Sequence, residues 1–260
     1  MVLNELVGQA DREQRQVEYE TTYQNLADVT QPKVDSIKYA IDIYPEERNI
    51  QLQGIQSIVN KSEGPIEKLY LNVAPGFLTE IEIPRAKLIN DDERLLMRTY
   101  EIVPPMAPGE VLEMKYTVRS KNRGIENQVS QTEIVQNGTF FNNSITPHFG
   151  YDSNRRIMDP KRRKALGLPE AEPFPALVRD CGDHCLVHYM SNDSDWVSVE
   201  TIISTSSDQI AVAPGSLVKQ WQDGDRNYFQ YRLDHRSLNF YSFISARYEV
   251  ERSMIGDVAT

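Results

Sequence analysis

Cysteine and histidine are scarce in this 260-residue chain, which contains two cysteines and four histidines. The sequence also has no Gly-x-Ser-x-Gly turn, no His-Glu-x-x-His pair, no glycine-rich phosphate loop and no dinucleotide fingerprint. These patterns mark common nucleophilic, zinc-hydrolytic and nucleotide-dependent chemistries. We therefore expect this chain to hold no catalytic centre and no cofactor of its own.

Long apolar runs and an excess of basic charge are missing as well. The apolar runs span only a few residues, as in 210–213, whereas a helix needs about 20 to cross a bilayer. The first ten residues lack the basic and apolar regions of a signal peptide. A net charge of −10 is repelled by phosphate backbones. We expect no nucleic-acid partner, and membrane contact only through segments outside this sequence.

One basic stretch departs from the acidic average. Its members are Arg155, Arg156, Lys161, Arg162, Arg163 and Lys164. Such a stretch is either a solvated loop or helix face, or a contact for an acidic partner.

Both cysteines fall in one short cluster with two of the histidines. The cluster reads Cys-x2-His-Cys-x2-His and consists of Cys181, His184, Cys185 and His188. Thiolate and imidazole are good zinc ligands, yet structural zinc sites usually separate two ligand pairs by a dozen or more residues. A metal site therefore remains an alternative to a local disulfide or free thiols.

Alternating apolar residues dominate from residue 34 onward. Ile37, Tyr39, Ile41 and Ile43 alternate with polar neighbours, and comparable short strands recur to about residue 250, separated by turn residues. This pattern predicts an all-β fold of saddle-shaped or sandwich-like antiparallel sheets. The apolar phase shifts after Gly54, which predicts a β-bulge there.

Two segments depart from the strand pattern, and prolines are expected to end one of the strands. Tyr19, Tyr23 and Leu26 have helical spacing, so residues 11–26 predict a short amphipathic helix that docks by one narrow stripe. A strand over residues 95–103 is expected to stop at Pro104. Residues 142–180 contain five prolines and predict a long irregular segment. We divide the chain into a helical connector (1–33), a β-domain (34–252) and the start of a linker (253–260).

The order of the motifs resembles the N-terminal β-domain of M1-family zinc aminopeptidases, in the branch fused to a bacterial ABC-2-type permease. The motifs that carry the resemblance, over roughly residues 34–252, are Tyr44-Pro45-Glu46, Gly54 with Val59-Asn60, the segment 105–110, Asn137-Gly138 with Phe140-Phe141, Pro147 to Tyr151, Arg163 to Leu168, Ser204-Thr205 through Gln209, Ala213-Pro214-Gly215, Trp221, and Asn239-Phe240 to Tyr248.

This resemblance implies a saddle-shaped domain packed against a following catalytic domain, which would carry the zinc, bind the peptide substrate and lie beyond Thr260. It also implies attachment to the permease and a location on the extracytoplasmic (periplasmic) face of a bacterial inner membrane. The family's β-domain lends one Gln or Glu to the free amine of the substrate, and Asn142 or Asn143 stands at that position here. Asn is shorter than Gln, so the alternative is that both amides close the turn after Phe141. His148 and Tyr151 would line the same cleft edge, or pack in the core.

A stand-alone peptide- or glycan-binding module is the alternative function. A glycan site needs exposed aromatic rings, which Trp196 and Trp221 could supply. Because both lie in predicted strands, we expect their rings in the core.

Overall fold

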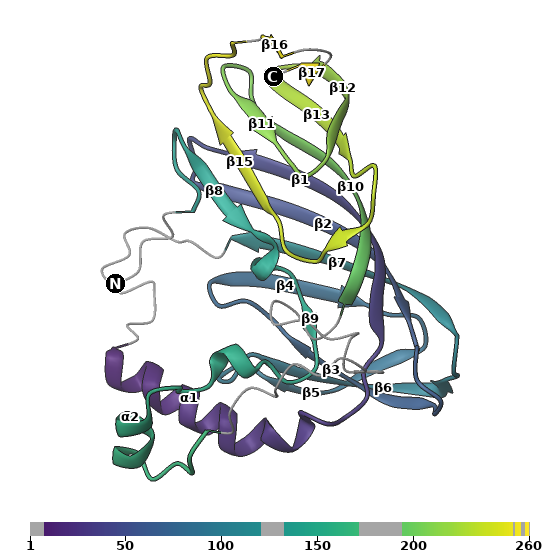
Figure 1. The fold of residues 1–260 in the computed structure, drawn as a ribbon, viewed down its shortest axis with the longest axis vertical. Helices are drawn as coiled ribbons and strands as arrows, with labels where there is room; N and C mark the ends of the chain where they lie inside the picture. The colour runs from purple at the N-terminus through teal and green to yellow at the C-terminus, as the bar shows by residue number, and fades with distance from the viewer. Residues whose placement is uncertain (1–7, 121–132, 172–193, 252, 256–257, 260) are drawn as a thin grey trace.

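The computed structural model describes residues 8–120, 133–171, 194–251, 253–255 and 258–259. The predicted all-β class is confirmed, since half of the chain is strand and 14% is helix. The strands form one large curved sheet with smaller sheets beside it, and the helices lie at one end (Figure 1). No helix in the described part of the chain combines the length and apolar character that a membrane crossing requires.

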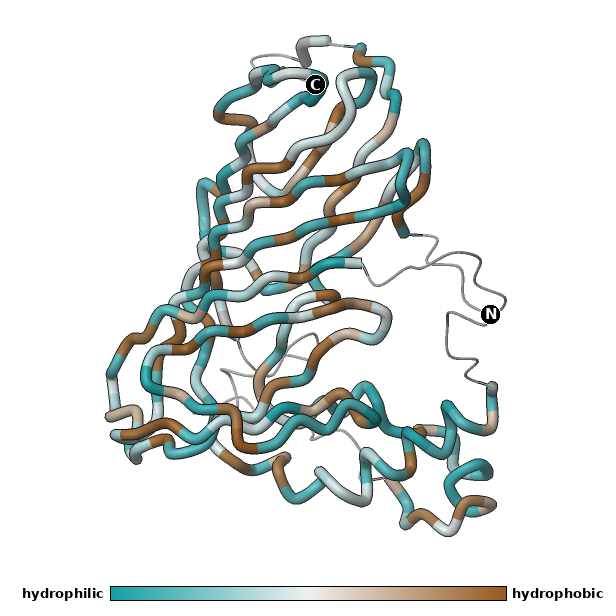
Figure 2. The backbone as a smooth tube through the Cα atoms, turned by 180° about the vertical axis from the view of Figure 1, so that it is seen from behind, coloured by the Kyte–Doolittle hydropathy of each residue, from teal (hydrophilic) through white to brown (hydrophobic). Residues whose placement is uncertain are grey.

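The large sheet runs the length of the molecule. Its order is β12 (Ser216–Asp223), β13 (Arg226–Arg232), β10 (Ser194–Ser206), β1 (Lys33–Tyr44), β2 (Asn49–Val59), β7 (Val111–Ser120) and β4 (Phe77–Glu82), with β14 (Ser237–Leu238) against β10. Apolar and polar residues alternate along these strands (Figure 2), so one face of the sheet is buried and the other faces solvent.

Two smaller sheets and a hairpin complete the strands. One sheet has the order β5 (Ala86–Asp92), β6 (Met97–Met106), β3 (Ile66–Asn72) and β9 (His148–Phe149), and the other β11 (Ile210–Val212), β15 (Ser242–Ala246) and β8 (Thr139–Asn142). β16 (Met254–Ile255) pairs with β17 (Val258–Ala259). The helices are α1 (Gln9–Tyr23), α2 (Pro160–Ala165) and the 3-10 turns η1 (Gln24–Leu26), η2 (Asn143–Ile145) and η3 (Ser153–Arg155).

β1 lies at the centre of the large sheet and joins distant parts of the chain. It pairs antiparallel with β2 and parallel with β10, where Ile37 lies opposite Val199. Every other pair among the described strands is antiparallel. The parallel pair is possible because the long connection between the two strands can return the chain to the same end of the sheet.

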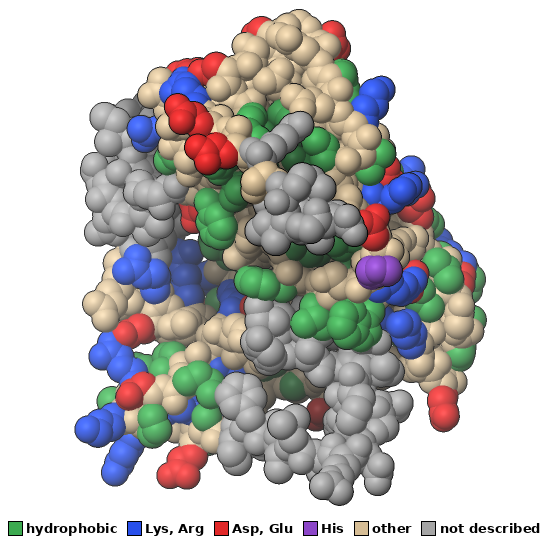
Figure 3. Space-filling view, turned by 45° about the horizontal axis from the view of Figure 1, so that its top comes forward, with side chains coloured by type: hydrophobic (Ala, Val, Ile, Leu, Met, Phe, Trp, Pro, Cys, Tyr) green, Lys and Arg blue, Asp and Glu red, His purple; other side chains and the backbone are tan. Residues whose placement is uncertain are grey.

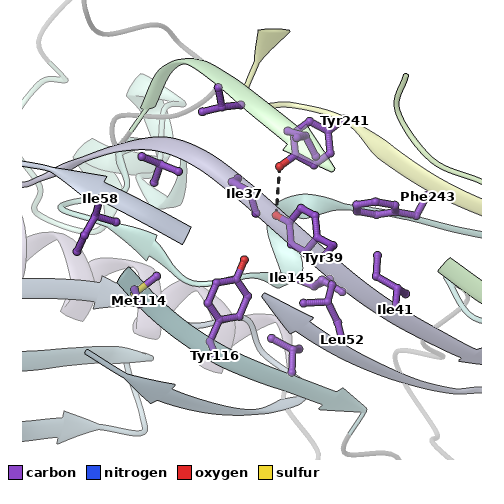
Figure 4. Close-up of a cluster of buried hydrophobic side chains, with 14 of the residues drawn as sticks. Ile37, Tyr39, Ile41, Leu52, Ile58, Met114, Tyr116, Ile145, Tyr241 and Phe243 are labelled. Carbon is purple, nitrogen blue, oxygen red and sulfur yellow. Dashed lines mark hydrogen bonds between the residues drawn. The ribbon is translucent and has the colours of Figure 1, made fainter. Parts of the chain in front are cut away.

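One hydrophobic core connects the three sheets. Tyr39 on β1 packs edge-on against Phe243 on β15, with ring centroids 5.5 Å apart, and its hydroxyl lies 3.2 Å from that of Tyr241. Phe141 on β8 contacts Phe243 at 5.3 Å. Figure 4 shows Tyr39, Tyr241 and Phe243 among the aliphatic side chains of β1 and β2. The inner face of the three-stranded sheet is therefore filled.

The β-bulge predicted at Gly54 is wrong. β2 stays in register with β1 at this point, where Gly54 lies opposite Tyr39, and the irregularity lies between Val34 and Ser36 instead. The inward position after Gly54 is taken by Gln56, which is buried and donates a hydrogen bond to the Tyr116 hydroxyl at 3.0 Å. Because a polar residue occupies an inward position, the apolar pattern changes phase after Gly54, although the backbone pairing of β2 stays regular.

The predicted strand end at Pro104 is also wrong, because β6 continues to Met106. The pairing of β6 with β3 is irregular across the prolines: Lys68 lies opposite Glu101, whereas Ile66 already lies opposite Met106. The prolines lack the N–H groups that a regular ladder needs, so they lie where that ladder is interrupted.

The predicted N-terminal helix and its docking stripe are confirmed. Tyr19, Tyr23 and Leu26 are all buried, and they form a second cluster with Leu95 and Met97 at the turn into β6. The Tyr23 hydroxyl donates to Asp92 at 2.7 Å. The helix is therefore packed against the turn into β6.

The basic stretch around α2 has an acidic partner within the same chain. Arg163 is 2% exposed and donates two hydrogen bonds to the Glu20 carboxylate on α1, at 2.6 and 3.0 Å. It also donates to the backbone oxygens of Ile157 and Pro169. Arg162 pairs with Glu13 of the same helix. Charged side chains of both signs meet over the helices in Figure 3.

Replacing Gly54 by alanine should lower the free energy of unfolding by about 1–3 kcal/mol through overpacking. A Cβ at this position would lie 2.2 Å from Cζ of Tyr116 and would displace its ring. Urea denaturation measures the change. The matched control is Gly64→Ala, whose Cβ meets nothing within 4 Å; equal losses in the two variants would refute the packing argument.

Replacing Arg163 by methionine should cost about 3–5 kcal/mol in unfolding free energy, because it removes both hydrogen bonds to the buried Glu20 carboxylate and leaves it only the more distant Arg156. The exposed pair is the control, since Arg162→Met should cost at most about 1 kcal/mol. The double variant Glu20→Met, Arg163→Met should recover part of the loss. A double variant less stable than Arg163→Met alone would contradict this account.

Candidate functional site

The two asparagines singled out by the sequence lie at the end of β8, in the turn η2. Asn142 precedes this turn, and its side-chain oxygen accepts a hydrogen bond from the backbone N–H of Ser144 at 2.9 Å. This is the helix-capping geometry that asparagine favours. The Asn142 side chain is half-buried, so it reaches the surface while closing the turn.

Asn143 is buried, and both the nitrogen and the oxygen of its side-chain amide form hydrogen bonds. Its nitrogen donates to the backbone oxygen and the side-chain oxygen of Asn239, at 3.0 and 3.1 Å. Its side-chain oxygen accepts from the backbone N–H of Tyr241 at 3.3 Å. These bonds tie the end of β8 to the segment that enters β15. Of the two amides, Asn142 has the better access to a ligand.

His148 and Tyr151 follow the same turn and line one wall of a cleft of about 470 Å³. Nε2 of His148 lies 3.2 Å from the backbone oxygen of Asn143. The ring of Tyr151 is buried and stacks on Tyr19 of α1, with centroids 5.4 Å apart. The structure therefore brings His148 and Tyr151 together around one cleft, with Ser144 of η2 at the same wall.

The cleft has further polar residues that the sequence analysis did not connect with it, among them Asn72, Asp152 and Arg155, the last of which it named only as part of the basic stretch. Asn72 ends β3, while Asp152 caps the turn η3 and Arg155 ends it. The Tyr19 hydroxyl connects the two segments, because it donates to the side chain of Asn72 at 2.8 Å and accepts from the backbone N–H of Asp152 at 2.9 Å. The cleft thus presents a guanidinium, a carboxylate and an imidazole beside apolar side chains, which suits binding of a small ligand.

Burial disfavours the charged form of the tyrosines in this region. Loss of solvation, followed by the nearby charge of Glu20, raises the pKa of Tyr151 to about 12. Burial likewise raises the pKa of Tyr19. Both phenols are therefore neutral at physiological pH and act as hydrogen-bonding, apolar surfaces.

The alternative metal site, formed by Cys181, His184, Cys185 and His188, lies outside the described residues. Within the described ranges, no group of three or more His, Cys, Asp or Glu side chains is arranged to hold a metal ion.

The expectation that both tryptophans lie in the core is wrong. Trp196 is 53% exposed, and Trp221 lies half-buried near the edge of the large sheet. Trp221 stacks on Tyr228 at 5.2 Å, with the Lys219 ammonium over its ring. Alternation along a strand does not reveal whether another element covers the strand's outer face. The exposure of these two rings therefore could not be predicted from the sequence.

The raised pKa of Tyr151 predicts a loss of stability in alkali. The neutral phenol is favoured in the folded state, so its stabilising effect is full below the unfolded-state pKa of about 10 and disappears as the pH rises through about 12. Urea midpoints between pH 9 and 12 should therefore fall more steeply for the unaltered chain than for Tyr151→Phe. Parallel pH profiles would show that this phenol does not contribute.

Neither a family model nor a curated protein sequence matches this chain. Among solved structures, its fold is similar to the M1 zinc metallopeptidase from Deinococcus radiodurans, with a TM-score of 0.52 and 10% identity over 90% of this chain and 47% of that chain. A mutant of that enzyme bound to a Tyr-Ser-Ala substrate gives a TM-score of 0.51, at the same identity and coverage. A mutant of a two-domain M1 zinc metallopeptidase bound to L-arginine gives 0.52 at 10% identity, over 90% of this chain and 46% of that one.

The chain thus spans about half the length of the solved structures that it matches. At this identity the likeness concerns the fold alone. The predicted all-β fold is therefore similar to part of the fold of solved M1 zinc metallopeptidases.

Proposed function

We propose that this chain is the non-catalytic scaffold and substrate-side domain of a larger M1-like zinc metallopeptidase of the aminopeptidase type. The observation that carries the proposal is an apolar row on the outer face of the three-stranded sheet. The fold likeness to two-domain M1 metallopeptidases supports it.

The row crosses all three strands. Val212 on β11 lies opposite Ile244 on β15, which in turn lies opposite Phe140 on β8. Phe140 is 56% exposed, although its neighbour Phe141 is buried in the core. Hydrophobic side chains are visible on the face of the molecule that Figure 3 shows. Val212 and Ile244 are half-buried, and Val212 also packs against the core, so Phe140 is the exposed member of the row. An exposed aromatic side chain beside apolar neighbours supports a docking surface.

The position of Asn142 supports a substrate-side role. Asn142 lies two residues beyond Phe140 on the same face of β8, opposite Ser242. A domain that packs on the apolar row would therefore bring its surface next to this amide. The Asn142 side chain is short, but it stands at the edge of the proposed interface, where a substrate amine would enter.

In this proposal, the zinc ion is bound by the catalytic domain that follows this chain. The sequence has no His-Glu-x-x-His, and the described residues offer no ligand group for a metal. The following domain would supply the zinc ligands and bind the peptide together with this chain. The same proposal extends to attachment to an ABC-type permease and to a location on the extracytoplasmic face of a bacterial membrane.

A peptide- or glycan-binding module is the second candidate, and the exposed ring of Trp196 favours it. It differs in one testable respect, because such a module would act without a second domain. Trp221 is a weaker candidate for this role, since its ring is already stacked on Tyr228.

Zinc content and hydrolysis of amino-acid anilides, measured on this chain and on a polypeptide extended into the next domain, test the proposal. The extended protein should bind zinc and cleave, while this chain alone should do neither. In the extended protein, Phe140→Asp should lower hydrolysis at least tenfold by disturbing the docking of the two domains, because a charge would be buried at the interface.

The matched control is Leu78→Asp, which adds the same charge at an exposed apolar position on β4, away from the row. Equal activity of the two variants would refute the proposed docking face. Stoichiometric zinc in this chain alone would instead favour the site at Cys181, His184, Cys185 and His188. Binding of a glycan or peptide by this chain alone, lost in Trp196→Ala, would favour the second candidate.

A further inference from the structure

Arg155 differs from the other arginines of the basic stretch. Arg156, Arg162 and Arg163 each have a glutamate of α1 within ion-pair distance. Arg155 has no carboxylate partner in the part of the chain that the structure describes, although it is half-buried. Its guanidinium lies over the ring of Tyr19, 3.7 Å from the centroid, and donates to the side-chain oxygen of Asn72 at 3.2 Å.

Tyr19 and Asn72, which contact the Arg155 guanidinium, are themselves fixed by burial and hydrogen bonds. Tyr19 is fully buried, and its hydroxyl bonds to Asn72 and to the backbone of Asp152. Asn72 in turn donates to the backbone oxygen of Gly150 at 2.6 Å. A guanidinium stacked on an aromatic ring and fixed by one hydrogen bond keeps its other N–H groups in a set direction. The charge is therefore positioned in advance of any ligand.

Arg155 lines the cleft of about 470 Å³ between β3, the turn into β6 and the segment 144–155. Val73, Pro75, Leu96 and Phe149 form apolar parts of its wall, and Ser144 adds a hydroxyl. A volume of this order holds a small molecule. A fixed cation beside an apolar wall selects an anion that carries an apolar substituent, and guanidinium matches the two oxygens of a carboxylate.

We propose that this cleft binds an α-carboxylate with an apolar side chain, either that of a free amino acid or that of the carboxyl end of a short peptide, through Arg155. Asp152 lines the same cleft and provides a partner for the ammonium group when the ligand is a free amino acid. The proposal does not depend on the proposed function, because the cleft is built from residues of this chain alone.

Titration calorimetry on this chain with three ligands of the same shape tests the proposal. Leucine carries both charges, N-acetyl-leucine carries only the carboxylate, and leucinamide carries only the ammonium. Leucine and N-acetyl-leucine should bind with one-to-one stoichiometry, and leucinamide at least tenfold more weakly than leucine. Methyl NMR signals of Val73 and Leu96 should shift on binding, which locates the ligand in the cleft.

Arg155→Gln should weaken binding of both carboxylates at least tenfold, whereas Lys161→Gln should leave it unchanged. Lys161 carries the same charge at an exposed position on α2, so it controls for a general effect of basic charge. Tighter binding of leucine than of N-acetyl-leucine would identify a free amino acid as the ligand, and the reverse order the end of a peptide.

The ligand comparison on the unaltered chain keeps the proposal falsifiable even if Arg155→Gln unfolds. The proposal is overturned if no carboxylate binds at millimolar concentration, if leucinamide binds as tightly as leucine, or if Lys161→Gln weakens binding as much as Arg155→Gln. Each of these results leaves the docking face around Phe140 untouched, so failure here is distinguishable from failure of the proposed function.

Discussion

The pairing of β1 with both β2 and β10 is the constraint on which the rest of the fold depends. It places a strand from the start of the β-domain directly beside one that begins about 160 residues later in the sequence, at Ser194. The inward side chains of β1, such as Tyr39, then form the surface on which Phe243 and Tyr241 pack. Because this packing fills the inner face of the three-stranded sheet, only the outer face with Phe140 remains for a partner.

The helices at the other end depend on charge as well as on apolar contact. Tyr19 and Tyr23 bury the stripe of α1 against the turn into β6, while Glu20 pairs with Arg163 on α2. A buried ion pair of this kind favours one arrangement mainly because any other leaves a charge without its partner. The same arrangement sets Arg155 over Tyr19 and so shapes the cleft. The docking of α1 and the candidate ligand site are therefore one structural unit.

Local patterns in the sequence predicted what depends on local physics. The spacing of Tyr19, Tyr23 and Leu26 predicted the docked helix, and alternation predicted β1. The bulge at Gly54 was predicted wrongly because Gln56 is a buried polar residue whose partner, Tyr116, lies 60 residues away in the sequence. Trp196 was placed in the core because alternation does not say whether a strand's outer face is covered. The sequence motifs named His148 and Tyr151 for a cleft edge, but nothing local connected them with Asn72, which ends β3 and reaches the cleft only through the tertiary fold.

The central claim is that a second domain covers the outer face of the three-stranded sheet. Hydroxyl-radical footprinting of Phe140, in this chain alone and in the polypeptide extended into the next domain, tests it most directly. Phe140 is 56% exposed here, so it should be oxidised readily in the isolated chain and be protected several-fold in the extended protein, while Trp196 stays equally reactive in both. Equal oxidation of Phe140 in the two proteins would contradict the account.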